Sequence, residues 1–125
     1  MQGRQDGEVA RARIDDAAGT AAVHDWSVGD GGREVRARAV RYTLQVLAER
    51  AEGNTVEVRV PPFGAVQCIE GPRHTRGTPP NVVETDAETW LALATGVLTW
   101  GDGLASGRIH ASGQRADLTG HLPVL

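Results

Sequence analysis

The sequence predicts a mixed α/β (α+β) domain in which helices cover one face of a sheet, and three features of the chain indicate it. Residues 55–60 alternate polar and apolar side chains, which is the period of a strand buried on one face. Residues 33–51 repeat their apolar side chains at spacings of three and four, as a helix does. Cap and stop signals divide residues 85–107 into two further helices. The expected order is helix, three strands, two helices, strand, and a terminal helix or turn.

Length and composition limit the classes of protein that fit. The 125 residues suit one domain, and a net charge of -3 argues against a nucleic-acid binder. No apolar run approaches the roughly 20 residues that cross a membrane, and the N-terminus lacks the apolar stretch of a signal peptide. We therefore expect a cytoplasmic protein with at most peripheral membrane contact. The lone Cys68 and four histidines in separate segments predict no metal site, and we expect no cofactor.

Residues 1–32 are expected to be flexible or weakly ordered. They are rich in Gly, Ala and Asp and carry few large apolar side chains, so they bury too little surface to order themselves. Within them, residues 9–14 could form a strand and residues 23–26 could pack on the domain. The folded domain is expected at residues 33–125.

Two apolar seams run along the expected helix at residues 33–51. The first is formed by Val35, Ala39, Tyr42 and Val46, and the second by Val40, Leu44, Leu47 and Ala51. At about 100° per residue the seams lie roughly 140° apart. The remaining arc carries Arg38, Arg41, Gln45 and Glu49. So wide an apolar face must be covered from two directions, by the sheet and by another helix, a partner chain or a ligand. A homodimer could form through this second seam or through an exposed sheet edge.

The next segment contains three expected strands. Val56, Val58 and Val60 should face inward, and residues 61–64 should then reverse the chain. Residues 66–69 give a second strand, and the loop at residues 72–80 leads into a third at residues 81–84.

The last part of the chain is divided by caps and glycines. Thr85 and Glu88 fit a capping box, and the helix that they start should end at Gly96. Thr99 should cap a short second helix, and residues 108–112 read as a strand. The chain closes with a short helix or turn whose apolar residues are Leu118, Leu122 and Leu125.

These residues resemble a known family. The block VEVRVPPFGAVQCIEGPRHTRGTPPNVVETDAETWLALATG, followed by LASGRIHASGQRADLTGHLPVL, is similar to bacterial sterol carrier family proteins, relatives of the sterol carrier or non-specific lipid-transfer domain. The likeness covers about residues 33–125, and the PRHTRGTPPN loop resembles an actinobacterial-type subgroup. It implies a curved, mostly antiparallel sheet of five strands, with helices on one face enclosing an apolar tunnel for a lipid tail or sterol.

Some longer proteins of this kind carry an N-terminal helical bundle like that of thiol-dependent maleylpyruvate isomerases, in which metal-binding histidines reside. Residues 1–32 do not match that bundle, so the resemblance does not imply the isomerase activity here.

Two sets of residues are candidates for a ligand site. Ten apolar side chains are expected around a ligand: Leu44, Leu47, Val56, Val58, Phe63, Val66, Trp90, Leu93, Trp100 and Leu104. The alternative is that the same residues form a closed core. Arg73, His74 and Arg76 could bind the anionic head group of a lipid, although a solvated loop explains them as well.

We therefore expect a carrier of a hydrophobic ligand, such as a lipid, fatty acid or sterol-like molecule, without enzymatic activity of its own. The first alternative is a protein-interaction or structural module whose cavity is filled by side chains. The second is an accessory domain related to thiol-dependent isomerases, or an enzyme that uses a small thiol. No Gly-rich phosphate loop or catalytic triad is recognisable, and Cys68 suits a small buried side chain better than a catalytic thiol.

Overall fold

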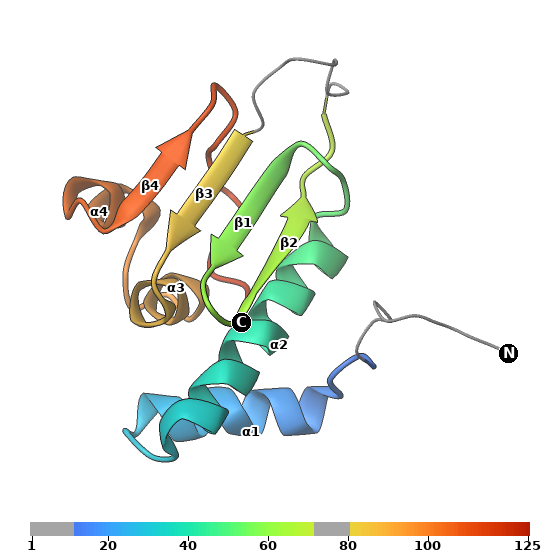
Figure 1. The fold of residues 1–125 in the computed structure, drawn as a ribbon, viewed down its shortest axis with the longest axis vertical. Coiled ribbons are helices and arrows are strands. Elements are labelled where there is room, and N and C mark those ends of the chain that lie inside the picture. Colours follow the sequence, from blue (N-terminus) through green and yellow to red (C-terminus); the bar gives the residue numbers. More distant parts are fainter. Residues whose placement is uncertain (1–11, 72–80) are drawn as a thin grey trace, which may run out of the picture.

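The computed structural model describes residues 12–71 and 81–125, which form helices packed on one sheet (Figure 1). The elements in order are α1 (Asp16–Ser27), α2 (Gly32–Arg50), β1 (Val56–Val60), β2 (Gly64–Cys68), β3 (Asn81–Thr85), α3 (Ala87–Ala94), α4 (Trp100–Ala105) and β4 (Ile109–Ser112). The mixed α+β class is confirmed. Among these described helices, none has the length and apolar character that a membrane crossing requires.

The sheet has the strand order β2-β1-β3-β4. Val58 of β1 lies opposite Val66 in antiparallel β2 and opposite Val83 in parallel β3, and β4 pairs antiparallel with β3. Two of the three pairings are antiparallel, as expected. The described residues form four strands rather than five. After β2 the chain leaves the sheet at Ile69. Its φ of 69° lies outside the range of β-strands, and its N–H bonds to the carbonyl of Ala51 instead of a neighbouring strand.

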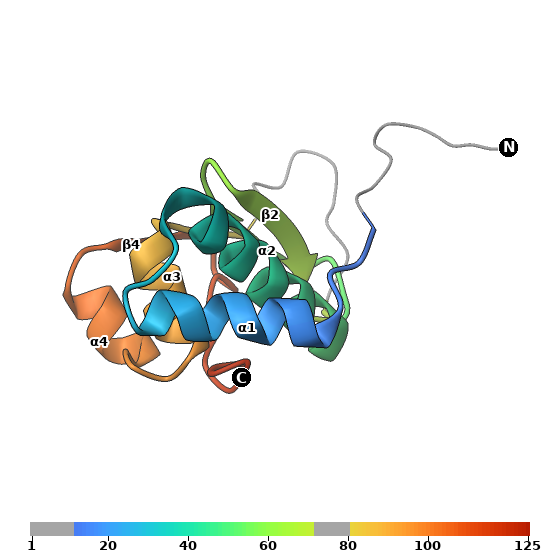
Figure 2. The same ribbon diagram turned by 90° about the horizontal axis from the view of Figure 1, so that it is seen from below.

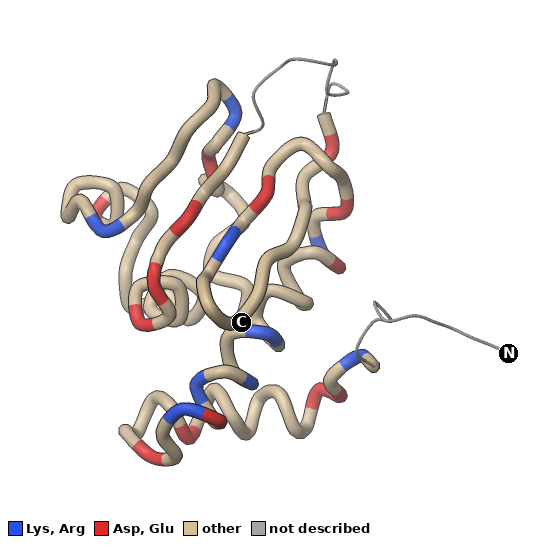
Figure 3. The backbone as a smooth tube through the Cα atoms, viewed as in Figure 1, with Lys and Arg blue, Asp and Glu red and all other residues tan. Residues whose placement is uncertain are grey.

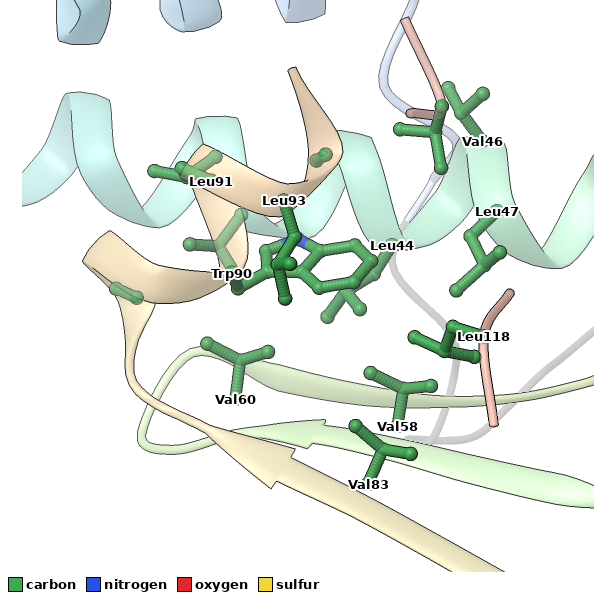
Figure 4. Packing of buried hydrophobic residues seen from close by; sticks show 14 of the residues in the cluster. Leu44, Val46, Leu47, Val58, Val60, Val83, Trp90, Leu91, Leu93 and Leu118 are labelled. Carbon is green, nitrogen blue, oxygen red and sulfur yellow. The ribbon is translucent and has the colours of Figure 1, made fainter. Parts of the chain in front are cut away.

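One face of the sheet is buried and the other is polar. The side chains of Val56, Val58 and Val60 are at most 1% exposed. Between them Glu57 and Arg59 point outward, where they form an ion pair of 2.8 Å. The helices α2 and α3 cover the buried face (Figure 4), so the alternation expected for β1 is confirmed.

The two seams of α2 are covered from two directions. Leu44 packs toward the sheet, while the ring of Tyr42 lies against Gly19 of α1. Figure 2 shows α1 running across α2 on the side away from the sheet. A side chain at position 19 would collide with the Tyr42 ring, so this glycine lets the two helices approach closely. Another helix, one of the three alternatives for the second cover, is therefore the one observed.

The expectation of weak order is wrong for residues 16–27, which form α1. Asp15 caps the helix by accepting a hydrogen bond from the N–H of Ala18 at 2.8 Å, and the Tyr42 hydroxyl donates to Asp16 at 2.8 Å. The helix buries small residues, so it does not need the large apolar side chains that the segment lacks. Residues 12–14 form no strand, and residues 9–11 lie outside the described part of the chain.

The expected contact of residues 23–26 with the domain is confirmed. Val23 is buried, and the indole N–H of Trp26 donates to Glu88 at 3.0 Å. Glu88 also pairs with Arg36 of α2 at 3.5 Å. These contacts tie the end of α1 to both α2 and α3.

The capping box expected at Thr85 is wrong. Asp86 is the N-cap of α3 and accepts from the N–H of Thr89 at 2.8 Å, whereas the Thr85 hydroxyl donates to the carbonyl of Arg108. Thr85 is the last residue of β3, so its side chain serves the sheet instead. The cap expected at Thr99 is confirmed, since its hydroxyl accepts from the N–H of Asp102 at 3.1 Å.

The chain closes in turns rather than a helix. Leu118 is fully buried as expected, but Val124 is buried in place of Leu125, which is 42% exposed. The reason is a hydrogen bond of 2.9 Å from the N–H of Val124 to the carbonyl of Ala94, which fixes this end of the chain against α3.

Candidate functional site

Side chains occupy the space between the sheet and the helices. Trp90 lies between α2 and the sheet and is fully buried (Figure 4). Its indole N–H donates to the hydroxyl of Thr43 at 2.8 Å, and that hydroxyl donates in turn to the carbonyl of Ala39 at 2.8 Å. The polar atoms of this pair are satisfied within the protein, which is what a closed core requires. Six of the ten residues expected around a ligand are fully buried parts of this cluster: Leu44, Leu47, Val56, Val58, Trp90 and Leu93.

The largest hollow described lies at the surface, between α2 and the β1–β2 hairpin. It is an open groove of about 720 Å³, and we call it the α2–β2 groove. Of its larger side chains, that of Leu44 is buried, whereas Arg13 and Arg38 are exposed. The half-buried ones are Ile14, Arg41, Phe63 and Val66. The groove is lined by Ala12, Arg13, Ile14, Arg38, Arg41, Leu44, Gln45, Phe63, Gly64, Ala65 and Val66. It brings together Leu44, Phe63 and Val66 of the ten expected residues.

One wall of the groove is the extended segment before α1, which the Gln45 side chain holds in place. The N–H of Ile14 donates to the amide oxygen of Gln45 at 2.9 Å, and the amide nitrogen of Gln45 donates to the carbonyl of Ile14 at 2.8 Å. The amide therefore pairs with the main chain as a neighbouring strand would. This amide clamp sets Ile14 against the groove.

Ion pairs add to the same wall. The guanidinium of Arg13 donates to Glu49 at 2.6 Å and to Asp16 at 3.1 Å. The hydrogen bond from Arg13 lowers the pKa of the Glu49 carboxyl, and hydrogen bonds from Tyr42 and then Arg13 lower the pKa of Asp16. All of these charges are exposed to solvent, so the pairs contribute modestly to stability. They do compensate the charge of Arg13.

The opposite wall is β2 and the turn before it. A Cβ at Gly64 would lie 3.5 Å from Leu44 and 3.7 Å from Arg41, so the missing side chain leaves space on the groove side of the strand. The half-buried Phe63 ring lies under the guanidinium of Arg33, 5.1 Å from the ring centre.

A second hollow of about 260 Å³ lies where α3, α4 and the closing turns meet. Leu93 and Trp100, from the expected set, line it together with Leu98, Leu122 and Pro123. Leu104, the last of the ten, is 42% exposed and lines neither hollow. The expected ligand residues are thus divided among the core, two hollows and the surface.

Arg73, His74 and Arg76 lie outside the described residues, so their role as an anion site stays a prediction. In the described ranges no group of three or more His, Cys, Asp or Glu side chains is arranged to hold a metal ion. The residues that sequence reasoning missed are Ile14, Arg13, Arg38, Arg41, Gln45 and Gly64. The sequence pattern predicts Arg38, Arg41 and Gln45 on the polar arc of the helix, but nothing in that pattern indicates a groove.

Comparison with known proteins supports the resemblance seen in the sequence. A family described as bacterial SCP ortholog, where SCP is the sterol carrier protein, matches residues 32–124. This match indicates lipid binding or carrying in general terms. No curated protein matches the chain. Because the family match covers well over half of the chain, the protein belongs to the bacterial sterol carrier protein family.

Proposed function

We propose that the protein binds a lipid in the α2–β2 groove and carries it without covalent chemistry. The observation that supports the proposal is an open groove of about 720 Å³ with apolar side chains at its base, in a chain of the sterol carrier protein family. Small-molecule sites are typically clefts of roughly 300–1,000 Å³ with mostly apolar linings and a few polar groups. The filled interior makes this surface groove the better candidate than a tunnel beneath the sheet.

Burial of the lipid tail would supply the affinity. Each methylene removed from water contributes about 0.8 kcal/mol, which corresponds to roughly a fourfold change in Kd. The free-energy cost of immobilising the ligand is subtracted once from the total binding free energy, not once for each methylene. The proposal therefore requires that affinity rise with chain length for as long as the tail still lies against Leu44, Phe63 and Val66.

Gly64→Val tests the location, because it fills the space that this glycine leaves open. The new Cβ meets Leu44 and Arg41 at ordinary contact distances, and valine suits a strand, so the variant should fold. We expect Gly64→Val to weaken binding of a fluorescent fatty acid at least about tenfold, the loss of two methylenes or more. Gln67→Val, on the exposed side of the same strand, is the matched control and should bind as the wild type does.

Two results would count against the proposal in different ways. If Gly64→Val binds with unchanged affinity, the ligand does not lie in the α2–β2 groove. If the wild type takes up no member of a panel of fatty acids, phospholipids and sterols in a saturable way, the carrier function itself is wrong. A structural or interaction module with a filled interior would then be the better description.

A further inference from the structure

The charged side chains that line the α2–β2 groove all carry positive charge. Three of its lining residues are arginines and none is acidic. Two of them, Arg38 and Arg41, lie on α2, along which Figure 3 shows several positively charged positions. Arg13 is already compensated by Glu49 and Asp16. Among the described lining residues, the unpaired positive charge is that of Arg38 on α2.

Arg38 is the arginine best placed to receive a ligand. It lines the groove, it is exposed, and within the described ranges no carboxylate lies within ion-pairing distance of it. Glu34, one turn earlier on the same helix, makes no ion pair with it. An unpaired guanidinium beside an apolar groove is suited to a carboxylate or a phosphate, which it can bind through two hydrogen bonds.

The polar and apolar parts of the groove are separated along α2. Arg38, Arg41 and Leu44 follow at intervals of three, so they lie on one side of the helix. With a rise of 1.5 Å per residue, Leu44 lies about 9 Å along the helix from Arg38. Leu44 is in turn next to Gly64 of β2. The groove therefore offers a charged end and an apolar stretch in the order that an amphipathic molecule needs.

We propose that the ligand of this groove is a lipid with an acidic head group, a carboxylate or a phosphate monoester, held by Arg38 with its tail along Leu44 and Val66. This inference rests on the proposed function and narrows it. A neutral lipid of the same length, or a sterol with its single hydroxyl, gains the apolar contact but not the charge-assisted hydrogen bonds. Arg38 is thus the residue that determines specificity between acidic and neutral lipids.

The test compares ligands that share a tail and differ in the head group. Palmitate, hexadecyl phosphate, hexadecanol and cholesterol displace a neutral fluorescent probe from the wild type, Arg38→Gln and Arg38→Glu. We expect the wild type to prefer the acidic ligands about tenfold over hexadecanol, which is modest because Arg38 is exposed. Arg38→Gln should remove the preference, Arg38→Glu should reverse it, and hexadecanol should bind all three proteins alike. The two acidic ligands distinguish a carboxylate site from a phosphate site.

Arg50→Gln is the matched control, since Arg50 is exposed on the same helix and does not line the groove. It should keep the wild-type preference. Raising the salt concentration should reduce the preference in the wild type and leave the binding of hexadecanol unchanged. If hexadecanol and palmitate bind the wild type equally, the head-group inference is overturned while the carrier function stands. If no ligand displaces the probe and the probe does not bind, both proposals fall together.

Discussion

The hydrogen bond between Thr43 and Trp90 gives the most direct test of the filled interior. Thr43→Val keeps the shape of the side chain and removes the hydroxyl that accepts the indole N–H at 2.8 Å. Both side chains are fully buried, so the N–H loses its acceptor where solvent does not reach. An unpaired buried donor costs about 1–3 kcal/mol. We expect Thr43→Val to lower the free energy of unfolding by about 2 kcal/mol.

Urea unfolding followed by tryptophan fluorescence and far-ultraviolet circular dichroism measures this loss. A change of about 2 kcal/mol should lower Tm by about 8 °C for a chain of this size. Thr43→Ser keeps the hydroxyl and should lose only about 0.5–1.5 kcal/mol, the usual cost of deleting one buried methyl group. Trp90→Phe should cost less in the Thr43→Val background than in the wild type, because phenylalanine has no N–H to leave unpaired.

A Thr43→Val protein within about 0.5 kcal/mol of the wild type, with no coupling to Trp90→Phe, would refute the reasoning. Such a result would mean that the indole N–H finds water in place of the hydroxyl. The space between the sheet and the helices would then be hydrated rather than filled. A ligand site between the sheet and the helices would then again be an alternative to the surface groove.

Two further predictions concern the packing of α1 and the burial of the thiol. Gly19→Ala should destabilise the protein by about 1–3 kcal/mol in urea unfolding, because its Cβ collides with the Tyr42 ring. Gly101→Ala is the control, because a Cβ there meets nothing within 4 Å, and it should be neutral or stabilising by up to about 1 kcal/mol. If Gly19→Ala is tolerated equally well, the close contact between α1 and α2 is wrong. Burial raises the pKa of Cys68 from 9.0 to about 11, above its value in the unfolded chain, so its contribution to stability is complete below pH 9 and is lost as the pH rises toward 11. Unfolding free energies measured across this window should fall more steeply for the wild type than for Cys68→Ala, and parallel curves would show that the thiol is not buried.

Local patterns were sufficient for the elements whose cause is local. The alternation of Val56, Val58 and Val60 predicts β1, and the seams of α2 predict its length to within one residue at each end. α1 could not be predicted in this way, because its packing surface is made of small residues. The role of Gly19, which is to leave room for the Tyr42 ring, can be recognised only once the structure shows the two residues in contact. The predicted N-cap of α3, Thr85, lies one residue before the observed N-cap, Asp86. The reason is that the Thr85 hydroxyl bonds to the main chain across the sheet.

The candidate site was only partly predictable for the same reason. Leu44, Phe63 and Val66 were found because apolar side chains are the signal that sequence reasoning uses. The groove itself depends on a side chain missing at Gly64 and on the segment that Gln45 holds beside α2. Both are relations between parts of the chain that are far apart in sequence. In the sequence nothing distinguishes Arg38 from other solvated arginines, and only the structure shows that it lines the groove.

The amide clamp on Ile14 also determines how the protein should be labelled for these experiments. Because the clamp sets the main chain along the groove wall, Ala12 lines the groove, so the described part of the chain begins beside the proposed site. Leu125, at the other end, bonds through its N–H to the carbonyl of Ala94 at 3.3 Å, beside the end of α3. No residue of the closing turns lines the groove. Purification handles and immobilisation therefore belong after Leu125, where they leave the groove open to ligand.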